Sequence, residues 1–244
     1  MCATVVETAP AATDYAPPRH ARLLRPFLRW LFRGIFHLIS RVQVEGTAHV
    51  PAEGGYLIAI NHISLYEAPF VAAFWPRPIE IAGAAVVWQR RGQSTLARLY
   101  GAIQIHRGQV DRQMVKQTLA ALRSGYPLLI APEGGRSHTP GMRRAKPGVA
   151  YLAAAADVPV VPVGVIGSTE DFLRRGLRGE RPEIAMRIGE PFRLPAVQGR
   201  GSARRAALQR NADEVMVRIA ALLPPAYRGV YANGIPTDSP EAEK

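Results

Sequence analysis

From about residue 41 onward, short apolar runs alternate with longer segments in which apolar residues recur at the period of a helix. The apolar runs predict strands at 42–45, 56–60, 79–82, 103–105, 127–131, 160–166 and 183–188. Helices are predicted at 64–74, 92–100, 110–124, 147–156 and 202–222. Because nearly all-apolar strands alternate with helices, we expect an α/β fold, with one domain over 42–225 and a largely parallel mixed sheet flanked by helices. The working residues of such folds collect in turns at the carboxyl ends of strands.

Residues 19–41 have a different pattern, that of an amphipathic helix. At about 100° per residue, the basic side chains fall on one arc: Arg22, Arg25, Arg29, Arg33, His37 and Arg41. The opposite arc is apolar: Leu24, Phe27, Leu28, Leu31, Phe32, Ile35, Leu38 and Ile39. Such a helix either packs on its own domain or lies in a membrane interface with its basic face on lipid phosphates. The large apolar residues and Trp30 favour the interfacial helix, and the repeated arginines make a spanning helix costly.

The two ends of the chain are predicted to be loosely ordered. Residues 1–18 lack the apolar core of a signal peptide and end in two prolines, so they are interpreted as a disordered leader. Residues 226–244 are rich in Pro, Asp and Glu and are interpreted as a loosely ordered tail.

The composition limits the classes of molecule that the chain is expected to bind. The formal charge of +12, carried almost wholly by arginine, requires an anionic partner: nucleic acid, anionic lipid or a phosphorylated substrate. The arginines concentrated on residues 19–41 disfavour nucleic acid, for which no recognition motif is present. The only cysteine, Cys2, excludes a disulfide framework and agrees with a reducing compartment. The histidines lack metal-ligand spacing and no nucleotide-binding motif occurs, so we expect no metal site and no bound cofactor.

The first candidate site is the segment 61–67 (NHISLYE), directly after a predicted strand. On a continuous helix, positions five apart point about 140° from each other, so His62 and Glu67 meet only if the helix begins near Ser64. Glu67 would then fix the tautomer of His62, whose other ring nitrogen could take a proton from a hydroxyl. Alternatively, Ser64 and Glu67 form a capping box, in which Glu67 only accepts a hydrogen bond from the Ser64 backbone N–H.

A second candidate is Arg107, at the end of the short predicted strand 103–105. A guanidinium there could bind a phosphate through two hydrogen bonds, although a lone arginine at a strand end is more often only solvated. Lys146, just before a predicted helix, would place one more cation nearby. Residues 158–163 (VPVVPV) enter a buried strand and are expected to form an apolar wall.

The third candidate is the turn 132–137 (PEGGRS) after a buried strand. Its glycines, Gly134 and Gly135, would let backbone N–H groups approach an anion or a developing oxyanion, and Arg136 adds positive charge. Glu133 could hold a hydroxyl or orient a neighbouring base. An ordinary glycine turn leaving a strand is the alternative interpretation.

Taken in chain order, the segments NHISLYE, GAIQIHR, APEGGRS and VPVVPV resemble four motifs of the glycerolipid acyltransferases typified by 1-acylglycerol-3-phosphate acyltransferase. The resemblance covers about Val42 to Phe192. It implies that His62 is the general base on an acceptor hydroxyl and that Glu67 orients it. The predicted substrate-binding set is Arg107, Glu133, Gly134, Gly135, Arg136 and Lys146.

The resemblance also implies the reaction and its setting. A fatty acyl group would pass directly from acyl-CoA or acyl carrier protein to the hydroxyl of a lysophospholipid, most simply 1-acylglycerol-3-phosphate, giving phosphatidate. No acyl-enzyme is required, which fits a chain whose only cysteine is Cys2. We expect peripheral or monotopic attachment at the cytoplasmic face of the cell membrane, with an anionic membrane surface as partner.

Three departures from the family pattern put the acceptor in question. Glu67 stands where aspartate is usual, Gly135 where threonine is usual, and Ala131 where an aromatic residue is usual. The same chemistry on another lyso-lipid, a glycolipid or an amino-acid lipid is therefore a neighbouring hypothesis. A non-catalytic lipid-binding module at the membrane surface is the alternative of another class, and it predicts that His62→Ala leaves the function intact.

Overall fold

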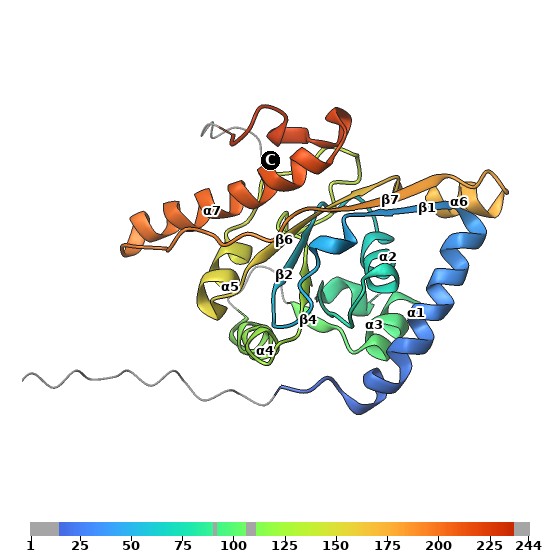
Figure 1. Cartoon of the computed structure of the whole chain (residues 1–244), viewed down its shortest axis with the longest axis horizontal. Helices are drawn as coiled ribbons and strands as arrows, with labels where there is room; N and C mark the ends of the chain where they lie inside the picture. Colours follow the sequence, from blue (N-terminus) through green and yellow to red (C-terminus); the bar gives the residue numbers. More distant parts are fainter. Residues whose placement is uncertain (1–14, 90–91, 106–110, 237–244) are drawn as a thin grey trace, which may run out of the picture.

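The computed structural model describes residues 15–89, 92–105 and 111–236. Its centre is a seven-stranded sheet with the strand order β1-β7-β6-β2-β5-β3-β4 (Figure 1). The strands are β1 (Arg41–Glu45), β2 (Leu57–Ile60), β3 (Glu80–Ala84), β4 (Ile103–Ile105), β5 (Leu128–Ile130), β6 (Val160–Ile166) and β7 (Glu183–Ile188). All neighbouring pairs are parallel except β6 and β7, so β1 and β7 run against the other strands. The predicted largely parallel mixed sheet is confirmed.

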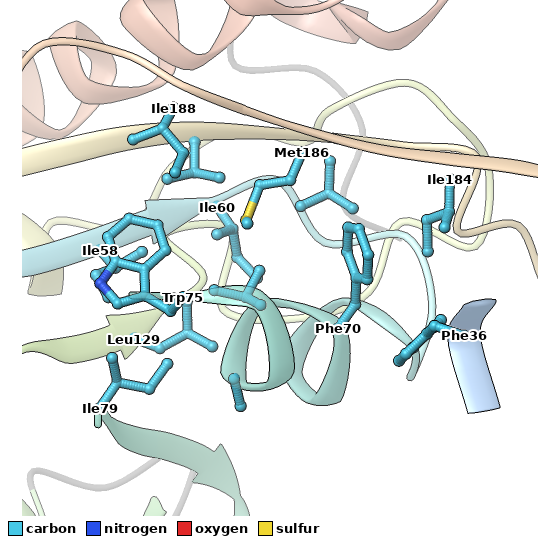
Figure 2. Packing of buried hydrophobic residues seen from close by; sticks show 14 of the residues in the cluster. Phe36, Ile58, Ile60, Phe70, Trp75, Ile79, Leu129, Ile184, Met186 and Ile188 are labelled. Atoms are coloured by element: carbon cyan, nitrogen blue, oxygen red, sulfur yellow. The ribbon is translucent and has the colours of Figure 1, made fainter. Parts of the chain in front are cut away.

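Helices cover both faces of this sheet. One face carries α1 (Arg19–Ile39), α2 (Glu67–Phe74) and α3 (Gln93–Tyr100), and the other carries α4 (Arg112–Arg123), α5 (Gly148–Ala156) and α7 (Gly201–Leu222). Alternate residues of β2 point to opposite faces, so Ile58 belongs to the core that also holds Phe36 of α1 and Phe70 of α2, while Leu57 joins the second core (Figure 2). Burial on both faces explains why the strands are continuous apolar runs.

The predicted helices are all present, and one helix, α6 (Phe172–Leu177), was not predicted. Two boundary predictions are wrong. Residues 226–236 are not a loose tail, because Tyr231 is buried and its hydroxyl donates to Asp213 at 2.7 Å. At the other end, the ring of Tyr15 packs edge-on against Tyr126, with centroids 5.6 Å apart, so the last leader residues, 15–18, are ordered. Residues 1–14 and 237–244 lie outside the described residues.

Three arginines of the basic arc of α1 donate hydrogen bonds to the protein itself, whereas Arg22 on the same arc is exposed. Arg25 is buried and makes two hydrogen bonds, of 2.6 and 2.7 Å, to the buried carboxylate of Glu80. Arg29 donates to the carbonyl oxygen of Trp75, and Arg33 donates to that of Ala73 at 2.6 Å. These two arginines bind carbonyls at the C-terminal end of α2, where the helix dipole favours a positive charge. The interpretation of this arc as a lipid-phosphate face is therefore wrong for the buried Arg25, while Arg29 and Arg33 each give at least one donor to the protein itself.

The outer face of α1 is apolar. Leu23 is 80% exposed, Phe27 55%, Trp30 71% and Leu38 77%. We call these four residues the α1 stripe; they follow one another at four, three and eight positions, which keeps them on one side of the helix. Figure 1 shows α1 running along the edge of the molecule, with no other helix or strand on its outer side. None of the described helices combines the length and the hydropathy that crossing a bilayer requires.

Candidate active site

The candidate site lies at the carboxyl ends of three neighbouring parallel strands. β6, β2 and β5 are adjacent in the sheet, and each is followed by a turn that carries polar side chains. Asn61 and His62 follow β2, the turn 132–137 follows β5, and Ser168 follows β6. The topology alone therefore brings together segments that lie far apart in the sequence.

Glu67 makes both contacts that the sequence left as alternatives. Helix α2 begins at Glu67, so His62 lies in the preceding turn and the helical offset does not separate the two side chains. Oε2 of Glu67 is 3.2 Å from Nδ1 of His62. Oε1 accepts from the backbone N–H of Ser64 at 2.8 Å, the hydrogen bond that the capping-box alternative predicted, and from that of Ile63 at 3.1 Å. Since α2 begins at Glu67 with Tyr66 as its N-cap, these bonds hold the preceding turn rather than cap the helix, and the other carboxylate oxygen contacts the imidazole.

The contact with Glu67 favours one tautomer of the His62 imidazole. Because Glu67 is a carboxylate acceptor, Nδ1 carries the proton and Nε2 is left as the basic nitrogen. The His62 side chain is 21% exposed and lines the cavity described below, whereas Glu67 is fully buried. This is the arrangement that general-base chemistry on a hydroxyl requires.

Two residues that the sequence reasoning missed support this pair. The Ser168 hydroxyl donates to Oε1 of Glu67 at 2.6 Å, and Ser168 is completely buried. The side chain of Asn61 bonds both backbone groups of Val165, donating to its carbonyl at 2.9 Å and accepting from its N–H at 2.7 Å. Asn61 comes directly after the buried strand β2 and Ser168 two residues after β6, positions that could have drawn attention to them.

The Glu133 carboxylate lies against the backbone of His62 and does not face a substrate. It is 1% exposed, and its two oxygens accept from the backbone N–H groups of His62 and Arg143, both at 2.8 Å. Burial raises the pKa of the Glu133 carboxyl from 4.5 to about 7, and its hydrogen bonds to the two N–H groups oppose that rise only in part. Of the two roles considered for Glu133, this position favours orienting the neighbouring His62 over holding a substrate hydroxyl.

The glycine turn forms one wall of the site. Gly134 has φ +68°, and a Cβ there would come within 2.8 Å of the Lys146 side chain, so this position requires glycine. Gly135 and Arg136 line the cavity, and their contact with substrate stays a prediction. Lys146 packs its methylenes over Gly134 and is not among the residues that line the cavity. The turn is joined to His62, whose carbonyl accepts from the Ser137 N–H at 2.8 Å.

A cavity of about 710 Å³ opens beside His62. Its polar end is lined by His62, Arg136, His138 and Arg143. His138 and Arg143 were assigned no role from the sequence. The rest is mainly apolar and runs between α1, α2 and α3, where it is lined by side chains that include Leu28, Phe32, Ala72, Leu96 and Leu129. The arrangement can hold a long apolar chain with a polar or anionic group beside the histidine.

One predicted substrate-binding residue cannot be placed, and no metal site was predicted. Arg107 lies outside the described residues, so its predicted role in phosphate binding stays a prediction. In the part of the chain that the structure describes, no three His, Cys, Asp or Glu side chains gather as a metal site would require. His138, at the polar end of the cavity, instead pairs with Glu170 at 2.5 Å.

Comparison with known proteins relates the chain to one family. The family model described as "Acyltransferase" matches residues 41–166. Human 1-acyl-sn-glycerol-3-phosphate acyltransferase alpha is 33% identical over 137 residues, which cover 54% of this chain and 47% of that protein. The lyso-ornithine lipid O-acyltransferase of Pseudomonas aeruginosa is 30% identical over 208 residues, covering 78% and 76%. The chain thus spans about half the length (47%) of the human relative.

The fold also matches a solved structure. The crystal structure of the 1-acyl-sn-glycerophosphate (LPA) acyltransferase PlsC from Thermotoga maritima superimposes with a TM-score of 0.57 over 80% of both chains. Sequence identity is 19%, so this likeness speaks for the fold alone.

Proposed function

This chain belongs to the glycerolipid acyltransferase family, and from that premise we propose that it transfers a fatty acyl group from a thioester to the hydroxyl of a lyso-lipid. The observation that carries the proposal is the His62–Glu67 pair, with His62 at the polar end of a mainly apolar cavity. An apolar cavity next to a general base suits a substrate that joins an acyl chain to a reacting polar group.

The proposed reaction needs no bound cofactor. Nε2 of His62 removes the proton of the acceptor hydroxyl as its oxygen attacks the thioester carbonyl, and Glu67 stabilises the imidazolium that forms. The tetrahedral intermediate then collapses, its carbon–sulfur bond breaks, and the leaving thiolate takes the proton back from His62. The glycine turn and Arg136 lie where charge on the carbonyl oxygen could be stabilised.

We propose 1-acylglycerol-3-phosphate as the acceptor and phosphatidate as the product. The support is the cationic polar end of the cavity, where Arg136 and Arg143 could bind a phosphate next to His62. The donor would be acyl-CoA or acyl carrier protein, either of which presents the same thioester.

A lyso-ornithine lipid is a second candidate acceptor. It is favoured by the match to the Pseudomonas aeruginosa relative, which extends over 208 residues rather than 137. The amine of an ornithine headgroup would find the carboxylate of Glu170 beside His138, which lines the cavity. The two acceptors differ in the sign of the charge that the site must bind.

The α1 stripe supports a peripheral position on a membrane, from which such acceptors would be drawn. Large apolar side chains exposed along one side of a helix are typical of interfacial binding. Exposed cations such as Arg22 lie on the same helix and could meet anionic headgroups.

The test is a transfer assay on the purified full chain. Acyl-CoA and acyl carrier protein thioester are offered separately with 1-acylglycerol-3-phosphate or lyso-ornithine lipid, and both thiol release and the acylated lipid are measured. We expect fastest transfer to the phosphate-bearing acceptor. Preference for the lyso-ornithine lipid would select the second candidate, and no transfer to any lyso-lipid would contradict the proposed function.

A further inference from the structure

Glu67 is an unusual orienting acid because its side chain has three rotatable bonds and is completely buried. Its Oε1 is surrounded by donors: the Ser64 backbone N–H at 2.8 Å, the Ile63 N–H at 3.1 Å, and the Ser64 hydroxyl at 3.3 Å. All of these donors belong to the same turn as His62. The remaining donor, the Ser168 hydroxyl at 2.6 Å, is the shortest and comes from another strand.

We propose that Ser168 is a positioning residue for catalysis, which fixes the plane of the Glu67 carboxylate so that Oε2 faces Nδ1 of His62. A hydroxyl hydrogen bond to a charged carboxylate is short and strong. With Oε1 held from the side of β6, the carboxylate cannot rotate without breaking that bond. The inference rests on the proposed function, since it assigns Ser168 to the His62–Glu67 pair.

The backbone around Ser168 is itself fixed to the strand that carries His62. Asn61, next to His62, bonds both the N–H and the carbonyl of Val165, three residues before Ser168. Gly167 then turns the chain with φ +84°, where a Cβ would come within 2.1 Å of the carbonyl oxygen of Glu183. Two sets of side-chain hydrogen bonds therefore link β2 and the turn after it to β6 and the turn after it: Asn61 with Val165, and Ser168 with Glu67.

This connection explains how a glutamate can serve at this position. A longer side chain has more conformations to lose, so a second strand must hold it for the His62 contact to persist. The 3.2 Å distance between His62 and Glu67 is at the long end of the range for a hydrogen bond, so a small rotation of the carboxylate would break it.

The test compares Ser168→Ala with Ser40→Ala. Ser40 is an apt control because it is also fully buried and its hydroxyl also makes a 2.6 Å hydrogen bond, but to the carbonyl of Phe36 at the end of α1. We expect Ser168→Ala to lower kcat by roughly ten- to a hundredfold, the loss typical for a hydrogen bond to a charged group, with KM nearly unchanged. Ser40→Ala should keep both constants.

Two further measurements distinguish a positioning role of Ser168 from a general effect on protein stability. In a Glu67→Gln background, Ser168→Ala should cause little additional loss of kcat, since coupled residues are not additive. The proton resonance of His62 Nδ1–H should move upfield in Ser168→Ala and stay in place in Ser40→Ala. Because this resonance needs no turnover, it tests the inference even if the proposed reaction is wrong.

The inference is overturned if folded Ser168→Ala retains the kcat and the Nδ1–H resonance of the wild type, or if its loss of kcat is the same in the Glu67→Gln background. If Ser168→Ala does not fold, Ser168→Cys keeps the volume of the side chain with a weaker donor and should show a smaller loss of kcat and the same direction of shift. Full activity in Ser168→Cys together with an unmoved resonance would equally reject the role of Ser168.

Discussion

The buried carboxyl of Glu133 should make the stability of the protein depend on pH in an unusual direction. Its pKa is raised by burial from 4.5 to about 7, so between these values the folded chain binds a proton that the unfolded chain has released. The stabilisation is therefore complete below about pH 4.5 and is lost as pH rises through about 7. Since one pKa unit corresponds to about 1.4 kcal/mol, the loss approaches about 3 kcal/mol.

The Glu133→Gln variant isolates this contribution. Glutamine has nearly the same shape and no titrating group, so its effect on the hydrogen bonds to His62 and Arg143 is constant with pH. Urea unfolding at pH 5, 6, 7 and 8, as chosen test points, gives the free energy of unfolding of both proteins. We expect the wild type to lose up to about 3 kcal/mol relative to the variant between pH 5 and 8.

An exposed carboxylate provides the control for this experiment. Glu180 is 43% exposed and paired with Arg175, and Glu180→Gln should show no such change over the same range. A difference between the wild type and Glu133→Gln that is constant with pH would refute the reasoning, as would one that grows in favour of the wild type at high pH.

Three other predictions concern a buried ion pair, the exposed face of α1 and an arginine that lines the cavity. Arg25→Ala leaves the buried Glu80 carboxylate without its partner and should lower the free energy of unfolding by about 3–5 kcal/mol, measured by urea unfolding; full stability would show that the pair is dispensable. Trp30→Ser should weaken co-sedimentation with phosphatidylglycerol vesicles, whereas Ile235→Ser, an exposed apolar residue elsewhere, should not; equal binding of all three proteins would argue against the α1 stripe. Arg136→Gln should raise KM for 1-acylglycerol-3-phosphate more than for a phosphate-free acceptor, and equal changes would exclude phosphate binding by Arg136.

The fold could be predicted from the sequence because its strands are buried on both faces. Runs such as 160–166 are apolar throughout, and only a sheet covered on both sides buries such runs completely. Helix α6 was missed because it has only six residues, too few for a helical period to be visible.

The orientation of α1 could not be predicted from its periodicity. A helical pattern shows which side chains share a face, but it does not show which face meets the protein. The deciding partner is Glu80, at the start of β3, whose buried carboxylate binds Arg25. A lone acid at the edge of an apolar strand is a weak signal for such a pair.

The candidate site was predicted as far as it lies within continuous motifs. His62 and Glu67 are five residues apart, and the structure brings them into contact because α2 begins only at Glu67. Ser168 and Asn61 act across strands, so their partners are set by the order of β2 and β6 in the sheet. The burial of Tyr231 was not predicted because the residue lies in a segment whose polar composition suggested disorder. Its ring is nevertheless buried against the domain.

The most direct test of the proposed function is the rate of acyl transfer to 1-acylglycerol-3-phosphate by His62→Ala, compared with the wild type and with His49→Ala. His49 is a suitable control because its ring bonds the carbonyl of Ile188 and does not line the cavity. We expect His62→Ala to lower kcat by at least about a hundredfold with an unchanged circular dichroism spectrum. His49→Ala should stay near the wild-type rate. Wild-type turnover in His62→Ala would contradict the assignment of His62 as the general base.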